Sequence, residues 1–225
     1  MRSQERGVLS KTGTSVPSRS VLPQLTVERE LWRYGLKVVA GVDEVGMGPL
    51  AGPVVAAAVV FPPVSITNDW SSSLPRGVRD SKTLSAKARE QLEREIRQIA
   101  TGVGVGIVGV EEIDRINIYQ AGLKAMRLAV EQLPVTPQHL LIDGRSLRDL
   151  PCAQTSFIKG DRDVYSIAAA SIVAKVYRDR LMAELDKLYP DYGFARHMGY
   201  GTAAHRAALH QFGPCPIHRR SFRLL

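Results

Sequence analysis

The chain lacks the features that define several classes of protein. With only two cysteines in 225 residues, Cys152 and Cys215, it has no disulfide framework, and a cytoplasmic protein is expected. No apolar run reaches the roughly 18–20 residues of a transmembrane helix, because glycine, proline and charged residues interrupt the best candidate. The cysteines and histidines show no zinc-type spacing, and no segment is repeated. A composition of 44% hydrophobic and 23% charged residues then predicts a globular protein.

The positive charge lies at the two ends of the chain. The net charge is +8, and residues 1–37 hold seven Lys and Arg against three acids, while residues 192–225 hold five Arg and no acid. Basic flanks around a nearly neutral middle predict a polyanionic partner such as nucleic acid, with a cation held at the centre. A solvated, solubilising surface explains the same charge equally well.

Strand and helix patterns predict an α/β fold with three regions. Residues 1–25, rich in Ser, Thr and Arg, are expected to be a disordered basic extension. Residues 26–190 alternate apolar strands with amphipathic helices, which indicates a mixed sheet with helices on its faces. Residues 191–225 are expected to form a small helical C-terminal appendage. The expected strands are 36–44, 52–61, 102–110, 139–144 and 155–161, and the expected helices are 26–35, 86–100, 111–133, 163–190 and 202–213.

Acidic residues end three of the expected strands. Asp43 and Glu44 follow the first strand, Asp143 follows the fourth, and Asp161 follows the fifth. Each alone is explained by a turn or a helix cap, but four carboxylates at one sheet edge would repel each other without a cation. Oxygen ligands select Mg²⁺ or Mn²⁺, and two such ions about 3.5–4 Å apart can clamp a phosphodiester.

One geometric condition applies to the adjacent pair. Neighbouring residues of a strand point to opposite faces, so Asp43 and Glu44 are expected to converge only where the strand already breaks into its glycine turn, or through a backbone carbonyl.

Six motifs, taken in order, carry a family resemblance. They are GVDEVGMGPLAGPVVAAAVV, DSKTLS, LIDG, KGD followed by SIAAASIVAKVYRDR, YGFARHMGYGT, and HRRSF. From about residue 37 to residue 222 the chain closely resembles the bacterial ribonuclease HII family. The resemblance implies a ribonuclease H-like fold with a central mixed five-stranded sheet flanked by helices, residues 26–190 being the catalytic domain.

The resemblance also implies an activity and its residues. It implies a metal-dependent endonuclease that cleaves the RNA strand of RNA–DNA hybrids and ribonucleotides embedded in duplex DNA, leaving 5′-phosphate ends. The implied cofactor is Mn²⁺ or Mg²⁺, in a two-metal site. The family's catalytic, metal-binding carboxylates fall on Asp43, Glu44, Asp143 and Asp161.

Five further residues match the family's substrate-binding positions. Glycine removes the Cβ that would block approach of the backbone to a 2′-hydroxyl. In the family a Gly-Arg-Gly turn does this, and a tyrosine packs against the sugar at the ribonucleotide. Lys82 fits a phosphate contact, although a surface lysine explains it too, and the alternative for the tyrosine is a partly buried aromatic. The matching residues are Gly46, Met47, Gly48, Lys82 and Tyr200.

Two methionines depart from the family pattern. Met47 replaces the arginine of the glycine turn and Met198 replaces a lysine, so both positions lose a cation. We expect weaker selectivity for a single ribonucleotide, or a lower rate on it, and weaker phosphate binding overall.

Three functions remain open from the sequence. The first is a monomeric, cytoplasmic ribonuclease HII that removes misincorporated ribonucleotides or RNA primers in DNA replication and repair. The second is a hybrid-binding protein of the same fold with weak or lost catalysis. A metal-dependent phosphatase for small substrates explains the carboxylates but not the basic flanks or Tyr200.

Overall fold

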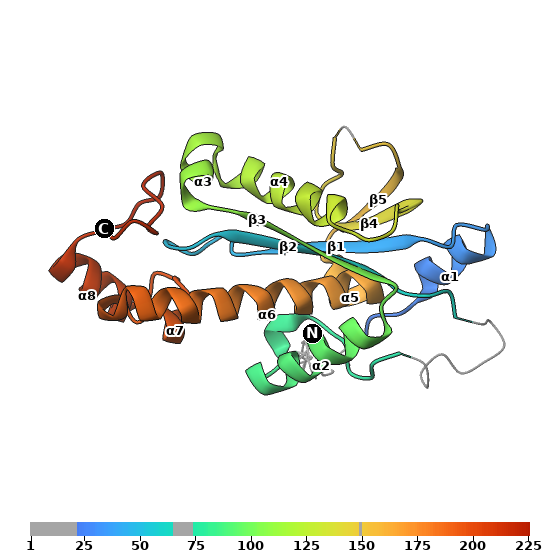
Figure 1. Ribbon diagram of the computed structural model, residues 1–225, viewed down its shortest axis with the longest axis horizontal. Coiled ribbons are helices and arrows are strands. Elements are labelled where there is room, and N and C mark those ends of the chain that lie inside the picture. The colour runs from blue at the N-terminus through green and yellow to red at the C-terminus, as the bar shows by residue number, and fades with distance from the viewer. Residues whose placement is uncertain (1–21, 65–73, 149) are drawn as a thin grey trace, which may run out of the picture.

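The computed structural model describes residues 22–64, 74–148 and 150–225 (Figure 1). The expected disordered extension lies almost entirely outside the described residues. The expected mixed five-stranded sheet is confirmed, in the order β3-β2-β1-β4-β5. Strands β1, β2 and β3 pair antiparallel, whereas β4 and β5 run parallel to β1. Their bounds are β1 Val39–Val45, β2 Val54–Val60, β3 Gly102–Val108, β4 His139–Asp143 and β5 Ala153–Phe157.

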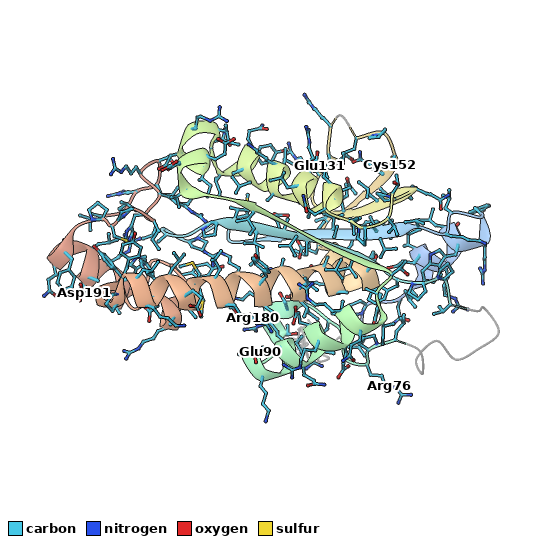
Figure 2. The ribbon with its side chains drawn as sticks, in the orientation of Figure 1. Arg76, Glu90, Glu131, Cys152, Arg180 and Asp191 are labelled. Carbon is cyan, nitrogen blue, oxygen red and sulfur yellow. The ribbon has the colours of Figure 1, made fainter. Side chains whose placement is uncertain are left out.

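Helices cover both faces of the sheet, as Figure 1 shows. Helices α3 (Val110–Ile116) and α4 (Ile118–Glu131) lie on one face, and α2 (Ala86–Ile99) and α6 (Tyr165–Leu188) lie on the other. Strand β2 is buried throughout, because its alternate residues pack into the two apolar cores between the sheet and these helices (Figure 2). The remaining short elements are α1 Thr26–Arg33, η2 Ser81–Thr83, α5 Gly160–Asp163, η3 Pro190–Tyr192, α7 Phe194–His197 and α8 Ala203–Phe212.

Helix α6 lies unusually close to β1. Its expected alanine-rich face is buried, and a Cβ added to Gly41 would overlap the Ser166 carbonyl group. Small side chains on the helix and a glycine on the strand therefore bring the long helix against the end of the strand that carries Asp43.

Two expectations about element boundaries were wrong. The single helix expected at 111–133 is broken at Asn117, which has φ 68° and whose side chain accepts a hydrogen bond from the Gln120 amide at 3.0 Å, so that it caps α4. Asp161 does not end a strand: β5 stops at Phe157, and Lys159 in the left-handed region begins the short helix α5, where Asp161 lies.

The C-terminal residues pack on the loop between β1 and β2, residues 46–53. A small core joins Leu50 and Ala51 of this loop to Phe194 and Leu209 of the C-terminal helices. Backbone hydrogen bonds from Arg219 to Leu50 and from Gly52 to Ile217, both 2.9 Å, reinforce the contact. Within the described ranges, no helix combines the length and apolarity that a bilayer crossing needs.

Candidate active site

The parallel pairing of β1 and β4 brings two of the predicted carboxylates side by side. Val42 pairs with Ile142, so Asp43 and Asp143 are the next residues on adjacent strands. Strand alternation points both toward the α6 face of the sheet. The Gly160 amide donates a hydrogen bond of 2.7 Å to Asp143 Oδ1, which ties the loop that carries Asp161 to the end of β4.

Asp43 and Glu44 extend from opposite faces of β1. Both remain in regular strand pairing, with Ala57 and Ala56 of β2, so the strand does not break between them as convergence would require. Glu44 faces α4, where a Cβ added to Gly122 would lie 3.9 Å from Glu44 Cγ. The two side chains therefore bracket the edge of the sheet. We call Asp43, Glu44, Asp143 and Asp161 together the acidic edge.

Electrostatics couple the acidic edge. Burial first, then the charges of Glu44, Asp143 and Asp161, raise the pKa of Asp43 well above its usual range, while a hydrogen bond from Ser171 opposes the shift. Burial and the charge of Asp143 raise the pKa of Glu44 to about 7. The pKa of Asp161 is also raised, mainly by burial and by Asp80. Fully ionised carboxylates at these positions are unfavourable without a compensating cation.

The chemistry of this donor set fits a hard divalent cation. Carboxylate oxygens are the ligands preferred by Mg²⁺ and Mn²⁺, and a bound cation would relieve the mutual repulsion. Within residues 22–64, 74–148 and 150–225, no three Asp, Glu, His or Cys side chains are already grouped to hold an ion. The ligand assignment to the acidic edge therefore stays a prediction, and binding requires these side chains to turn toward one another.

Lys82 lies beside the acidic edge. Its Nζ is 3.9 Å from Asp161 Oδ2, and its side chain is 78% exposed. The Asp80 side chain accepts a hydrogen bond from the Lys82 amide at 3.0 Å and holds the turn η2. Asp80, which the sequence reasoning did not single out, also lies 4.0 Å from Arg162 Nε. Lys82 thus presents an exposed cation at the carboxylates.

The glycine turn places three predicted substrate residues together. A Cβ on Gly48 would lie 3.8 Å from Cε1 of Tyr200, a residue that is 44% exposed. Gly46 has φ +93°, a conformation that favours glycine. Met47 turns toward α4, where a Cβ on Gly122 would come within 2.9 Å of its sulfur. The Met47 side chain is therefore packed against the helix rather than directed into solvent.

Two buried arginines hold this turn from beneath. From the sequence, Arg178 was expected either to pair with Asp179 along the helix or to pack beneath the site, and Arg219 was assigned no role. Arg219 donates to the carbonyls of Gly46 at 2.6 Å, Met47 at 3.2 Å and Gly52 at 3.0 Å. Arg178 donates to three carbonyls, those of Pro53, Ala51 and Met198, at 2.9, 3.2 and 3.0 Å. Burial lowers the pKa of both guanidinium groups, and the six bonds compensate part of this cost. In the sequence, the motifs YRDR and HRRSF were the signal available for the role of these two arginines.

A buried pair of histidines positions Tyr200. The Nε2 atoms of His205 and His218 are 2.9 Å apart, His205 Nδ1 lies 2.9 Å from the Tyr200 carbonyl, and His218 Nδ1 accepts from the Cys215 amide. These three contacts are satisfied together only when both rings are neutral, with His218 donating to His205 and His205 donating to the carbonyl.

We expect acid to loosen this region. Burial lowers the pKa of His218 from 6.5 to about 4 and also lowers that of His205. Below pH 6.5 the unfolded chain binds protons that the folded chain does not, so the free energy of unfolding falls as the pH drops toward 4. Hydrogen exchange of α8 measured across this range tests the prediction. His210 is exposed, so the variant His210→Gln should show the same pH dependence of α8 protection as wild type. Protection of α8 that does not change with pH would contradict the prediction.

Comparisons with known proteins give the sequence and the fold a family context. The family model described as ribonuclease HII matches residues 40–225. The ribonuclease HII of Syntrophotalea carbinolica is 51% identical over 207 residues, which cover 92% of this chain and 95% of that protein. The ribonuclease HII of Geobacter sulfurreducens is 55% identical over 191 residues, 85% of this chain and 84% of that protein. The crystal structure of ribonuclease H2 from Pyrococcus horikoshii superimposes with a TM-score of 0.67 and 28% identity, over 83% of this chain and 94% of that one.

Proposed function

The chain belongs to the ribonuclease HII family and is a ribonuclease H nuclease, and from this premise we propose that it cleaves the RNA strand of RNA–DNA hybrids and single ribonucleotides embedded in duplex DNA. The observation that carries the proposal is the acidic edge, where four carboxylates from β1, β4 and α5 gather beside an exposed lysine, and where burial and neighbouring charge raise the pKa of Asp43, Glu44 and Asp161. A site of this kind suits a cation and a phosphodiester together.

Each group of site residues has its own proposed role. Asp43, Glu44, Asp143 and Asp161 would hold Mn²⁺ or Mg²⁺ in a two-metal site, and the metal would supply activation of a water and charge stabilisation at the leaving 3′ oxygen, the chemistry of a cut that leaves a 5′-phosphate end. Lys82 contacts a phosphate of the bound strand. The backbone at Gly46, Met47 and Gly48 approaches the 2′-hydroxyl, and Tyr200 packs against the neighbouring sugar.

The same proposal assigns the two regions of the chain and the biological role of the protein. We propose that residues 26–190 form the catalytic domain and that residues 191–225 form a substrate-binding appendage, because Tyr200 projects from the latter onto Gly48 of the former. The protein then acts as a cytoplasmic monomer that removes ribonucleotides or RNA primers during DNA replication and repair.

Cleavage assays on two substrates test the activity. A duplex with one ribonucleotide and a long RNA–DNA hybrid are each incubated with Mn²⁺, with Mg²⁺ and with EDTA. Cuts with 5′-phosphate ends that need the divalent ion support the proposal. Intact substrates under all conditions, with the protein shown to be folded, would refute it.

A second function is favoured by one observation. Met47 supplies no charge at the turn where the family has an arginine, and its side chain packs on α4. A hybrid-binding protein with weak or lost catalysis is consistent with this turn. Tight binding of the hybrid without cleavage in any metal would select it.

Met47→Arg is expected to raise cleavage of a duplex with a single ribonucleotide by about tenfold, because a planar cation would be restored beside the scissile phosphate. Cleavage of a long hybrid should change much less. Steady-state kinetics on both substrates measure this difference, with Met47→Leu as a control that retains the packing against Gly122. An arginine variant no better than the leucine variant would contradict the prediction.

A further inference from the structure

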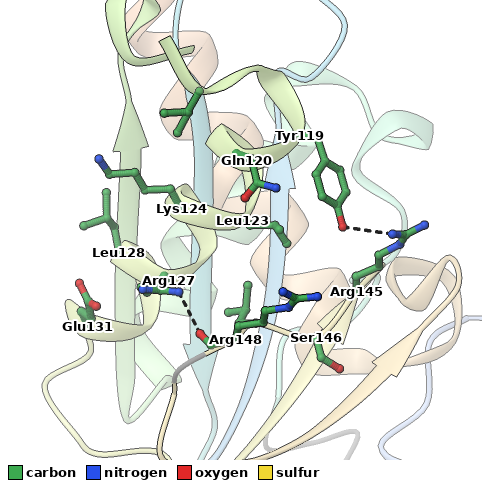
Figure 3. A pocket seen from close by; sticks show the side chains of 12 residues that line it. Tyr119, Gln120, Leu123, Lys124, Arg127, Leu128, Glu131, Arg145, Ser146 and Arg148 are labelled. Atoms are coloured by element: carbon green, nitrogen blue, oxygen red, sulfur yellow. Dashed lines mark hydrogen bonds between the residues drawn. The ribbon is translucent and has the colours of Figure 1, made fainter. Parts of the chain in front are cut away.

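A charged groove lies on the α4 face of the sheet, outside the acidic edge. It runs between helix α4 and the loop that joins β4 to β5, and it encloses about 790 Å³ (Figure 3). Its polar walls are formed by Tyr119, Lys124 and Arg127 of the helix and by Arg145, Ser146 and Arg148 of the loop. We call this feature the α4 groove.

One end of the α4 groove is near the acidic edge. Arg145 follows Asp143 by two residues, and Tyr119 lies one turn of α4 before Gly122, the position against which Glu44 and Met47 pack. From Tyr119 the helix runs away from the edge to Glu131, a length of roughly 18 Å at 1.5 Å per residue. A nucleic-acid strand that leaves the acidic edge on this side would enter the groove directly.

The open cations of the groove are on the loop. Lys124 is already paired with Glu112 at 2.6 Å, and Arg127 donates to the Arg148 carbonyl at 2.9 Å. Arg145 and Arg148 are exposed, and within the described part of the chain neither pairs with a carboxylate. Their charge is therefore available to an anion.

Arg145 is also held in place. Its Nη1 lies 3.4 Å from the Tyr119 hydroxyl, and its guanidinium carbon lies 5.5 Å from the centre of the Tyr119 ring (Figure 3). A guanidinium oriented by an aromatic ring loses less freedom on binding a phosphate than a solvated one does. The floor beneath it is apolar, formed by Leu123, Leu128 and Leu147, which suits the sugars between phosphates.

We propose that the α4 groove binds the phosphate backbone of the duplex that flanks the scissile site, on one side only. The inference rests on the proposed function, because one end of the groove is near the site that would cut the same polyanion. Glu131 at the far end repels phosphate and limits the contact. Roughly 18 Å corresponds to about five phosphates of one strand, at 3.4 Å each along the helix axis.

The test is a binding measurement on three duplexes, each with a single ribonucleotide, in EDTA so that no cleavage occurs. One duplex has flanks of about 12 base pairs on both sides, and each of the others has one flank shortened to about two, less than the contact length. Wild type is compared with the double variant Arg145→Gln/Arg148→Gln. The control is Arg33→Gln/Arg94→Gln, which removes the same charge at exposed arginines of α1 and α2.

The groove variant is expected to bind the long duplex and one of the shortened duplexes roughly tenfold more weakly, and to lower the salt slope by about two. On the other shortened duplex, which does not reach the groove, its Kd should stay within about twofold of wild type. Equal defects on both shortened duplexes, or a control variant as weak as the groove variant, would overturn the proposal. Absence of cleavage by wild type with Mn²⁺ would instead refute the proposed activity, and the one-sided binding defect would still support the groove.

Discussion

Asp43→Asn is expected to reduce cleavage at least about a thousandfold while making the metal-free protein more stable. Asp43 is buried, and the charges of three other acids act on it. The amide keeps the size of the side chain but removes a charge that burial and repulsion disfavour, so the folded state is favoured. The same change removes an anionic ligand of the proposed ion, and the transition-state stabilisation that depends on that ion is lost with it. A gain in stability on removal of a functional charge is typical of active sites.

Thermal unfolding separates the two effects. Without divalent ions the melting temperature of Asp43→Asn should exceed that of wild type by a few degrees, the shift of about 1 kcal/mol in a protein of this size. Mn²⁺ should raise the melting temperature of wild type, because it binds only the folded state, and should leave the variant nearly unchanged. Asp191→Asn, an exposed acid far along the chain from the edge, is the matched control. A variant that melts below wild type, and still responds to Mn²⁺, would contradict metal binding at the acidic edge.

The sequence was sufficient to predict the strands of the sheet and to predict which carboxylates of the site lie side by side. Alternating apolar runs predicted all five strands, because each strand must bury one or both faces, and the capping residues Ser85 and Thr202 begin α2 and α8 as expected. Strand ends then placed Asp43 beside Asp143 without any knowledge of distances.

The apolar pattern did not predict where the backbone breaks. The apolar period continues through Asn117, so residues 111–133 have the periodicity of one helix, and only the positive φ of that residue divides them. In the same way, KGD has the composition of a strand end, but Lys159 in the left-handed region turns the chain into α5. Periodicity reports which face is buried, not whether the backbone is continuous.

Of the two arginines beneath the glycine turn, Arg219 was missed for a related reason, and for Arg178 packing beneath the site was only one of two alternatives. A charged residue in an amphipathic segment is normally assigned to the solvated face, and Arg178 and Arg219 are the largest fully buried side chains of the described residues. Five of their six acceptors are carbonyls more than 120 residues away in the chain, and a sequence does not show which backbone carbonyls need a donor.

Arg219→Met is expected to be the most damaging change outside the acidic edge. Methionine fills much of the volume but leaves the carbonyls of Gly46, Met47 and Gly52 buried without their donor, at about 1–3 kcal/mol for each unsatisfied group. The free energy of unfolding should fall by about 3–5 kcal/mol. Because the same turn carries the backbone proposed to read the ribonucleotide, a displacement of about 1 Å would reduce cleavage by about a hundredfold even in molecules that remain folded.

The adjacent residue provides the matched control. Arg220 is exposed, and its contact with Asp114 uses the backbone amide, so Arg220→Met removes the same charge without removing a donor from the turn. Denaturant unfolding and single-turnover cleavage at 10 °C, where the variant is kept folded, measure stability and rate separately. Arg219→Lys should recover little, since one ammonium cannot reach three carbonyls that a planar guanidinium spans. If Arg219→Met cleaves as fast as Arg220→Met, the turn does not depend on this guanidinium, and substrate reading must come from Tyr200 and the acidic edge alone.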